Sequence, residues 1–158
     1  MNDNVSTLYA LAHELLYLGT DGKPIYSDDF TRLNREVYQL ADELYSYHGA
    51  TPEEEAKLCL SLLMAYNATA YDNGDKQEHI QGVLDRCWEV LDKLSPSLLK
   101  VQLLTYCHEA VYEKELADQA YSIIDTWDKA ALTSEQMEAV EELENTINYK
   151  YTYKIVKK

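Results

Sequence analysis

The stretch LCLSLLMAYNATAY, residues 58–71, contains no charged residue, although 27% of the whole chain is charged. At 3.6 residues per turn these residues would form about four turns of α-helix with no charged face. A helix of this kind is stable in water only when other protein surrounds it. It is too short to span a bilayer, which needs about 20 apolar residues, and Ser61, Asn67 and Thr69 interrupt it. We therefore expect a central helix packed among others, and no membrane span.

The residues that precede this stretch predict where the central helix begins. Thr51 and Glu54 have the spacing of a capping box, in which the threonine and glutamate side chains bind free backbone amides at the helix start. Pro52 between them suits the first helical position, because a residue there needs no amide donor. The central helix is therefore predicted to begin after Thr51 and to run to about Tyr71.

Two further helices are predicted upstream of the central helix, over about residues 5–18 and 28–48. Gly19 and Gly49 are expected to end them, and Ser27 is the predicted N-cap of the second. The apolar residues of that second helix alternate at spacings of three and four, which predicts one buried face. They are Phe30, Leu33, Val37, Leu40 and Leu44.

Downstream of the central helix the same patterns predict four more helices, over about residues 75–94, 96–112, 114–130 and from 133 onward. Thr133 and Gln136 have the spacing of a second capping box. The short stretches at 84–88 (LDRCW) and 124–127 (IDTW) recur about 39 residues apart, which is compatible with stacked helical hairpins. We expect an all-α fold, a compact bundle of six or seven helices with a repeat-like, helical-hairpin second half.

The charge of the chain is unevenly distributed. It contains 28 acidic and 14 basic residues, with a net charge of −14, but residues 149–158 (YKYTYKIVKK) hold four of the basic residues and no acid. We expect a single domain over residues 1–148, with a charge of −18, and a basic C-terminal tail over residues 149–158. The tail could contact nucleic acid or add as a strand to a partner, although a loosely held terminus is the simpler interpretation. The acidic domain repels phosphates and anionic lipid, so we expect no direct nucleic-acid or membrane binding.

The cysteines and the start of the chain indicate a cytoplasmic protein. Cys59, Cys87 and Cys107 are odd in number and form no CxxC pair, which is typical of buried thiols in a reducing compartment. No charged and apolar leader precedes the first predicted helix, so no signal peptide is expected.

Motifs for catalysis or metal binding are missing from the sequence. It contains no phosphate-binding glycine loop, no nucleophile elbow and no HExxH motif. Cys107 and His108 are adjacent, which on a helix directs them about 100° apart and does not suit a shared metal ion. We expect no catalytic residues, no metal and no cofactor. The alternative of an acid-rich hydrolase would require a pocket with a desolvated carboxylate.

The connector between the first two predicted helices is our candidate for a protein-binding surface. It combines turn-forming glycines with tyrosines and acids, and tyrosine rings are frequent in interfaces. The predicted partner-binding residues are Tyr17, Asp21, Lys23, Tyr26, Asp28 and Asp29. In the alternative interpretation, Asp28 and Asp29 serve only to stabilise the N-terminus of the second helix.

Four blocks of the sequence resemble the UpxZ family, whose members are encoded in capsular polysaccharide loci. They are LAHELLYLGTDGKPIYSDDFTRLN, TPEEEAKLCLSLLMAYNATAYDNGDK, VLDRCWEVLDKL and SLLKVQLLTYC, and the similarity runs over about residues 5–143. The resemblance implies a regulator that antagonises NusG-like antitermination factors, the UpxY proteins, of other capsule loci. It implies no catalytic residues and brings no residue-level binding motif. A helical-hairpin adaptor for another protein or peptide is the alternative, and mimicry of DNA is one possible mechanism of inhibition; the oligomeric state is open.

The charge distribution gives a first testable prediction. Purified protein is expected to show no measurable binding to duplex DNA or RNA at physiological salt, where non-specific binders have dissociation constants of about 10⁻⁴ to 10⁻⁶ M. Fluorescence anisotropy with labelled duplexes measures this. Tight binding that disappears when residues 149–158 are deleted would show that the tail is a nucleic-acid contact.

Overall fold

The computed structural model describes the backbone of residues 2–20, 22–70 and 74–157, and the side chains of residues 3–20, 22–70 and 74–147. These residues form seven α-helices, and no strand occurs among them. The prediction of an all-α fold with six or seven helices is confirmed. The chain divides into two compact units, Met1–Lys93 and Leu94–Lys158, which we describe separately.

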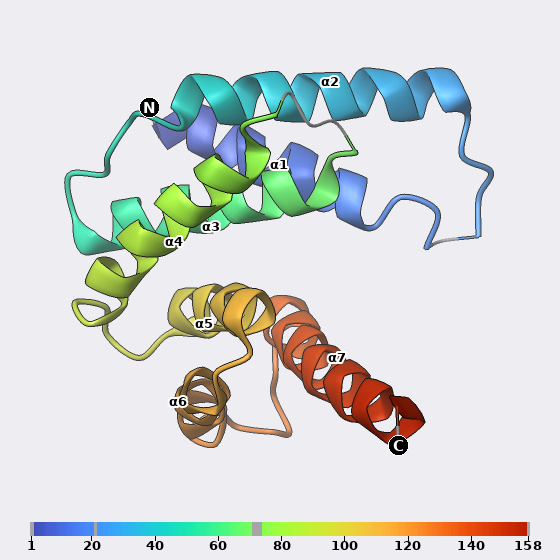
Figure 1. The fold of residues 1–158 in the computed structure, drawn as a ribbon. Coiled ribbons are helices and arrows are strands. Elements are labelled where there is room, and N and C mark those ends of the chain that lie inside the picture. The colour runs from blue at the N-terminus through green and yellow to red at the C-terminus, as the bar shows by residue number, and fades with distance from the viewer. Residues whose placement is uncertain (1, 21, 71–73, 158) are drawn as a thin grey trace. The chain divides into compact units, whose positions relative to one another are not determined.

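The first unit contains four helices, and the third of them is its centre. They are α1 (Asn2–Leu16), α2 (Ser27–Leu44), α3 (Pro52–Ala68) and α4 (Lys76–Leu91). Helix α3 packs against each of the other three, as Figure 1 shows. The helix predicted to be surrounded by protein therefore has neighbours on several sides.

The middle of helix α3 is buried around its whole circumference. All nine residues from Leu58 to Tyr66 are buried. The one hydroxyl-bearing aliphatic side chain among them, Ser61, donates a hydrogen bond to the carbonyl of Lys57 (2.8 Å), so its burial leaves no unsatisfied hydroxyl. Burying a leucine side chain contributes about 1.5–3 kcal/mol, so this segment supplies much of the stability of the first unit.

Side-chain hydrogen bonds are present at both ends of α3. At the start, Thr51 Oγ1 accepts a hydrogen bond from the amide of Glu54, which is one half of the predicted capping box. The carboxylate of Glu54 accepts from the amide of Ala50 (3.0 Å), one residue before the N-cap, so the reciprocal half is displaced. The helix ends at Ala68, three residues before the predicted end. Just beyond it, Asn34 of α2 accepts a hydrogen bond from the amide of Ala70 (2.7 Å), which ties the departing chain to α2.

The N-terminal end of α2 differs from the sequence prediction in two respects. The N-cap is Tyr26, and no side chain caps the helix there, so the prediction of Ser27 as N-cap is wrong. Phe30, the first residue of the predicted buried face, is 38% exposed. The apolar stripe begins to be buried at Leu33.

The C-terminal end of α2 is set by a residue from another helix. The helix ends at Leu44, well before Gly49, because Arg86 of α4 binds the carbonyls of Tyr45 and Tyr47. Gly49 is needed for a different reason from the one predicted. A Cβ atom there would overlap the backbone at the start of α3, so only glycine allows this close approach.

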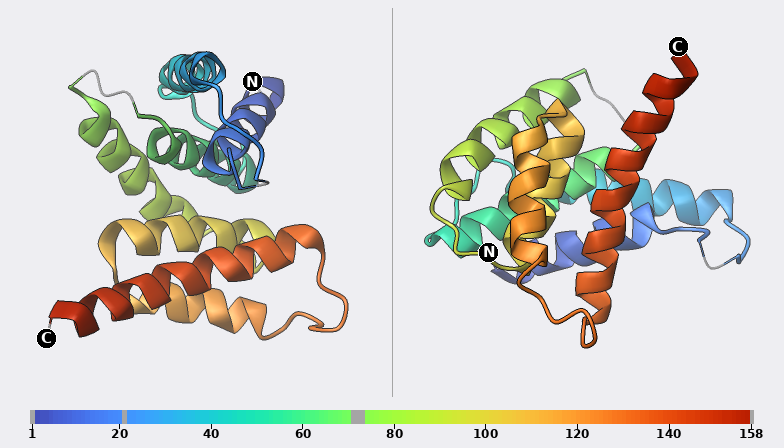
Figure 2. Two further views of the ribbon diagram at one scale, coloured as in Figure 1. Left: turned by 90° about the vertical axis from the view of Figure 1, so that its right-hand side faces the viewer. Right: turned by 90° about the horizontal axis from the view of Figure 1, so that it is seen from below.

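The second unit is a helical hairpin with one further helix. Its helices are α5 (Leu98–Val111), α6 (Lys114–Ile124) and α7 (Ser134–Lys157). Helix α5 packs against both α6 and α7 (Figure 2). Tyr112 separates α5 from α6 with a left-handed backbone (φ 56°), and Thr133 and Gln136 form the predicted reciprocal capping box before α7.

The cysteines and the helices can be compared with what the sequence predicted. Cys59, Cys87 and Cys107 are buried, as expected. Within the described residues, no helix has both the length and the apolar character that crossing a bilayer requires. The division into a domain over residues 1–148 and a tail over residues 149–158 stays a prediction.

Candidate functional site

Some of the predicted partner-binding residues are packed against their neighbours, and others are exposed. Tyr17, just after α1, is only partly exposed, and its ring lies against His13 with 4.6 Å between ring centroids. Lys23 is exposed, and Asp21 lies outside the described residues. Tyr17 therefore contributes to packing at the end of α1.

Three of the predicted residues lie together at the start of α2. Tyr26 is 65% exposed, and Asp28 and Asp29 are exposed in the first turn of the helix. Asp29 is 3.7 Å from Arg32, but both side chains are more than 60% exposed, so this ion pair is weak. The proposal that these residues bind a partner stays a prediction.

Sequence reasoning missed two neighbours of Tyr26. Ile25 is 51% exposed and Phe30 is 38% exposed, so both extend the apolar surface around the tyrosine. Phe30 is the only phenylalanine in the chain. Its helical spacing placed it on the buried face, and only the positions of the neighbouring helices show that it is left partly exposed.

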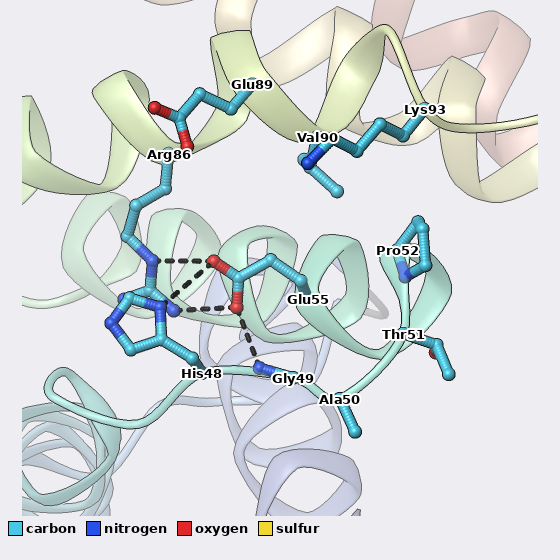
Figure 3. Close-up of a pocket in the computed structure, with 10 residues that line it drawn as sticks. All are labelled: His48, Gly49, Ala50, Thr51, Pro52, Glu55, Arg86, Glu89, Val90 and Lys93. Carbon is cyan, nitrogen blue, oxygen red and sulfur yellow. Dashed lines mark hydrogen bonds and ion pairs between the residues drawn. The ribbon is translucent and has the colours of Figure 1, made fainter.

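A pocket of about 260 Å³ lies between α4 and the chain segment that leads into α3 (Figure 3). Both acidic and basic side chains line it. It is lined by His48, Gly49, Ala50, Thr51, Pro52, Glu55, Arg86, Glu89, Val90 and Lys93.

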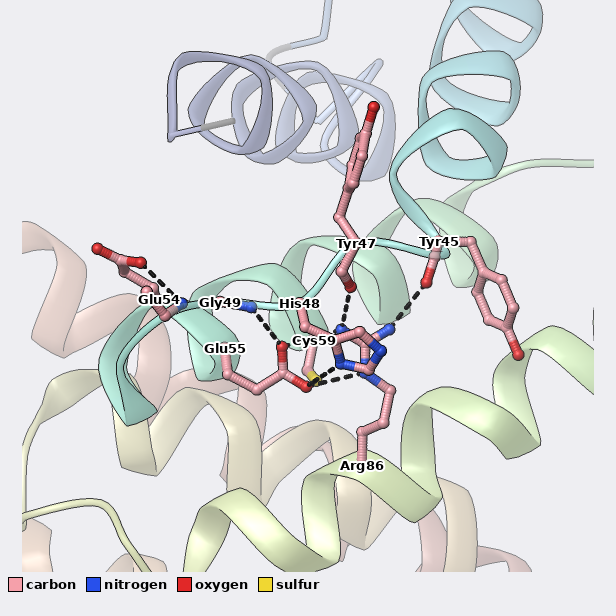
Figure 4. A network of polar contacts seen from close by, with 9 residues as sticks. Tyr45, Tyr47, His48, Gly49, Glu54, Glu55, Cys59 and Arg86 are labelled. Carbon is pink, nitrogen blue, oxygen red and sulfur yellow. Dashed lines mark hydrogen bonds and ion pairs between the residues drawn. The ribbon is translucent and has the colours of Figure 1, made fainter.

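An ion pair between Glu55 and Arg86 occupies one side of this pocket. The two nitrogens Nε and Nη2 of Arg86 each lie 2.9 Å from an oxygen of Glu55, which is the bidentate geometry of a strong pair. Arg86 also donates to the carbonyls of Tyr45 (2.8 Å) and Tyr47 (2.6 Å) (Figure 4). The guanidinium group thus joins three segments: α4, α3 and the chain that follows α2.

The electrostatics of Glu55 fit a structural role. Burial alone would raise the pKa of Glu55, but the hydrogen bonds from Arg86 and from the amide of Gly49 outweigh burial and lower this pKa below its ordinary value. The carboxylate is therefore ionised at neutral pH and cannot act as a general acid there. Its contribution to stability is present above the ordinary glutamate pKa and is lost as the pH falls through the lowered native pKa.

A second polar cluster joins α2, α3 and α4. The hydroxyl of Tyr66 donates to Asp42 (2.8 Å) and lies 3.1 Å from Nδ1 of His79, on which the ring of Tyr45 stacks. Burial and the hydrogen bond to Asp42 raise the pKa of Tyr66, so the phenol stays protonated and is not a nucleophile. Gly82 of α4 makes room for the Tyr45 hydroxyl, which a Cβ atom would overlap. The cluster therefore stabilises the packing of α2, α3 and α4.

The described residues offer no metal centre. No group of three or more histidine, cysteine, aspartate or glutamate side chains is arranged there to hold a metal ion.

Both the sequence and the structure of this chain are similar to known proteins. A family model described as the UpxZ family of transcription anti-terminator antagonists matches residues 5–109. The chain belongs to this family. The resemblance drawn from the sequence blocks is confirmed, and the UpxZ family is one of transcription regulators and not a known class of enzymes.

A solved UpxZ structure extends the match beyond residue 109. The crystal structure of a transcription anti-terminator antagonist UpxZ from Bacteroides uniformis is 46% identical, with a TM-score of 0.87. The alignment covers 96% of this chain and 94% of that one. No curated protein sequence matches the chain.

The contacts of Arg86 give a testable prediction about stability. Replacing Arg86 with alanine leaves Glu55 mostly buried without its cation, and we expect a loss of about 3 kcal/mol in the free energy of unfolding. Arg32→Ala is the matched control, because Arg32 pairs with Asp29 and Glu36 on the exposed face of α2 and should change stability by less than about 0.5 kcal/mol. Urea unfolding followed by circular dichroism measures both. Equal effects of the two substitutions would contradict the structural role of Arg86.

Proposed function

We propose that this protein binds a NusG-like antitermination factor of the UpxY type, encoded by another capsular polysaccharide locus, and stops it from assisting RNA polymerase. Membership of the UpxZ family over residues 5–109 carries this proposal. The 46% identical antagonist, aligned over 96% of the chain, supports the same regulatory function. Because RNA polymerase works in the cytoplasm of bacteria, the protein is expected to act there.

The charge of the chain supports a protein partner. A factor that works beside DNA and nascent RNA benefits from basic surface, since lysine and arginine bind phosphates. A chain with a net charge of −14 attracts such a surface and repels the nucleic acid itself. Complementary charge mainly accelerates the encounter, and a few buried aromatic anchors then determine how long the complex lasts.

The surface that we propose for this contact is the connector between α1 and α2 with its flanks. Its residues are Tyr17, Asp21, Lys23, Tyr26, Asp28 and Asp29. The exposure of Tyr26 and of both α2 acids supports it. The competing structural role, in which Asp28 and Asp29 only stabilise the helix N-terminus, would contribute about 0.3–1 kcal/mol for each.

A transcription assay tests the proposed function. RNA polymerase transcribes a template with a terminator in the presence of a purified UpxY-type factor from another locus, and the protein is then titrated in. We expect read-through to fall to the level seen without the factor, and surface plasmon resonance to show direct binding whose association rate falls with added salt. Unchanged read-through at saturating protein, together with no binding, would reject the regulatory function. Binding without any effect on read-through would favour the adaptor alternative.

A further inference from the structure

The N-terminal end of α2 carries a partly exposed apolar surface. In Figures 1 and 2 this end of α2 reaches beyond α1 and α3. Ile25, Tyr26 and Phe30 are 51%, 65% and 38% exposed, and we call these three residues the α2 anchor. Seven large apolar side chains are exposed among the described residues, and three of the seven lie here within six positions. Such a concentration is typical of an interaction site.

The backbone holds the α2 anchor in place. The amide of Phe30 donates to the carbonyl of Tyr26 (3.0 Å), and the carboxamide of Asn34 donates to the carbonyl of Phe30 (3.0 Å). The side chain of Ile25 lies close to Gly19, whose positive φ of 86° returns the connector toward α1. A surface that is already ordered loses little conformational entropy on binding, which favours affinity.

The charges beside the α2 anchor indicate what kind of surface it fits. Asp28 and Asp29 lie in sequence between Tyr26 and Phe30, and all are exposed. Arg32 partly neutralises Asp29, whereas Asp28 forms no ion pair with any residue that the structure describes. Acids beside an apolar surface favour a basic partner. They disfavour anionic lipid and also a second copy of this chain, which carries the same charge of −14.

We infer that the α2 anchor binds an apolar face, flanked by lysine or arginine residues, on the antitermination factor. This inference rests on the proposed function and adds to it the contact residues Ile25 and Phe30 and the chemistry of the partner's surface. The three side chains enter the apolar face, while Asp28 and Asp29 meet the flanking cations. Large side chains at the centre of an interface dominate affinity, and charges at its rim contribute less.

Binding of a variant that lacks the anchor tests this inference. In the double variant Ile25→Thr, Phe30→Gln, we expect the Kd for the UpxY-type factor to rise at least about tenfold, because hot-spot side chains each cost more than 1 kcal/mol when removed. Met137→Gln is the matched control, since Met137 is an apolar side chain, 50% exposed, on helix α7 of the second unit. This control should change the Kd less than twofold. Calorimetry measures affinity, and thermal unfolding checks that both variants keep the wild-type midpoint.

The outcomes of this experiment show whether the proposed function fails or only the inference about the α2 anchor. If the wild-type chain does not bind the factor, the proposed function fails and the inference fails with it. If the wild type binds and the double variant binds equally well, only the inference fails. A wild-type dimer in gel filtration that the double variant abolishes would also overturn it, because a second copy would then occupy the anchor. Should the double variant unfold early, Tyr26→Ser provides the same test at the most exposed of the three positions.

Discussion

The charge-free segment of α3 is the constraint on which the first unit depends. Nine consecutive buried residues, Leu58 to Tyr66, need apolar neighbours around the whole helix, and α1, α2 and α4 supply them. Figure 1 shows that α2 begins beyond α3, and burial along α2 starts only at Leu33, so its first turn lies outside this packing. The same packing that buries α3 therefore leaves the α2 anchor exposed.

The polar groups near α3 are used to hold the helices together. Arg86 binds Glu55 and two carbonyls after α2, and Tyr66 binds Asp42 beside His79. Because these side chains already satisfy one another, the interior of the first unit offers no free acid, base or nucleophile from them for catalysis. This arrangement agrees with a family of regulators, in which recognition takes place at the surface.

Sequence reasoning predicted the features that depend on local chemistry. The N-cap at Thr51, the capping box at Thr133 and the burial of residues 58–66 follow from side chains within a few positions of one another. The end of α2 could not be predicted in this way, because it depends on Arg86, about forty residues further along the chain. The exposure of Phe30 was missed for a related reason. Helical spacing gives the face on which a residue lies, but how far the neighbouring helices extend decides whether that face is covered.

We propose that this family member recognises its partner through the exposed N-terminal end of α2. Hydrogen–deuterium exchange of the full-length protein, alone and in complex with a UpxY-type antitermination factor, tests it most directly. We expect binding to slow exchange of the amides at residues 22–31, whereas residues 46–51, in the loop that follows the C-terminal end of α2, should exchange at an unchanged rate. A stable complex that protects another surface and leaves residues 22–31 unchanged would show that the partner binds elsewhere.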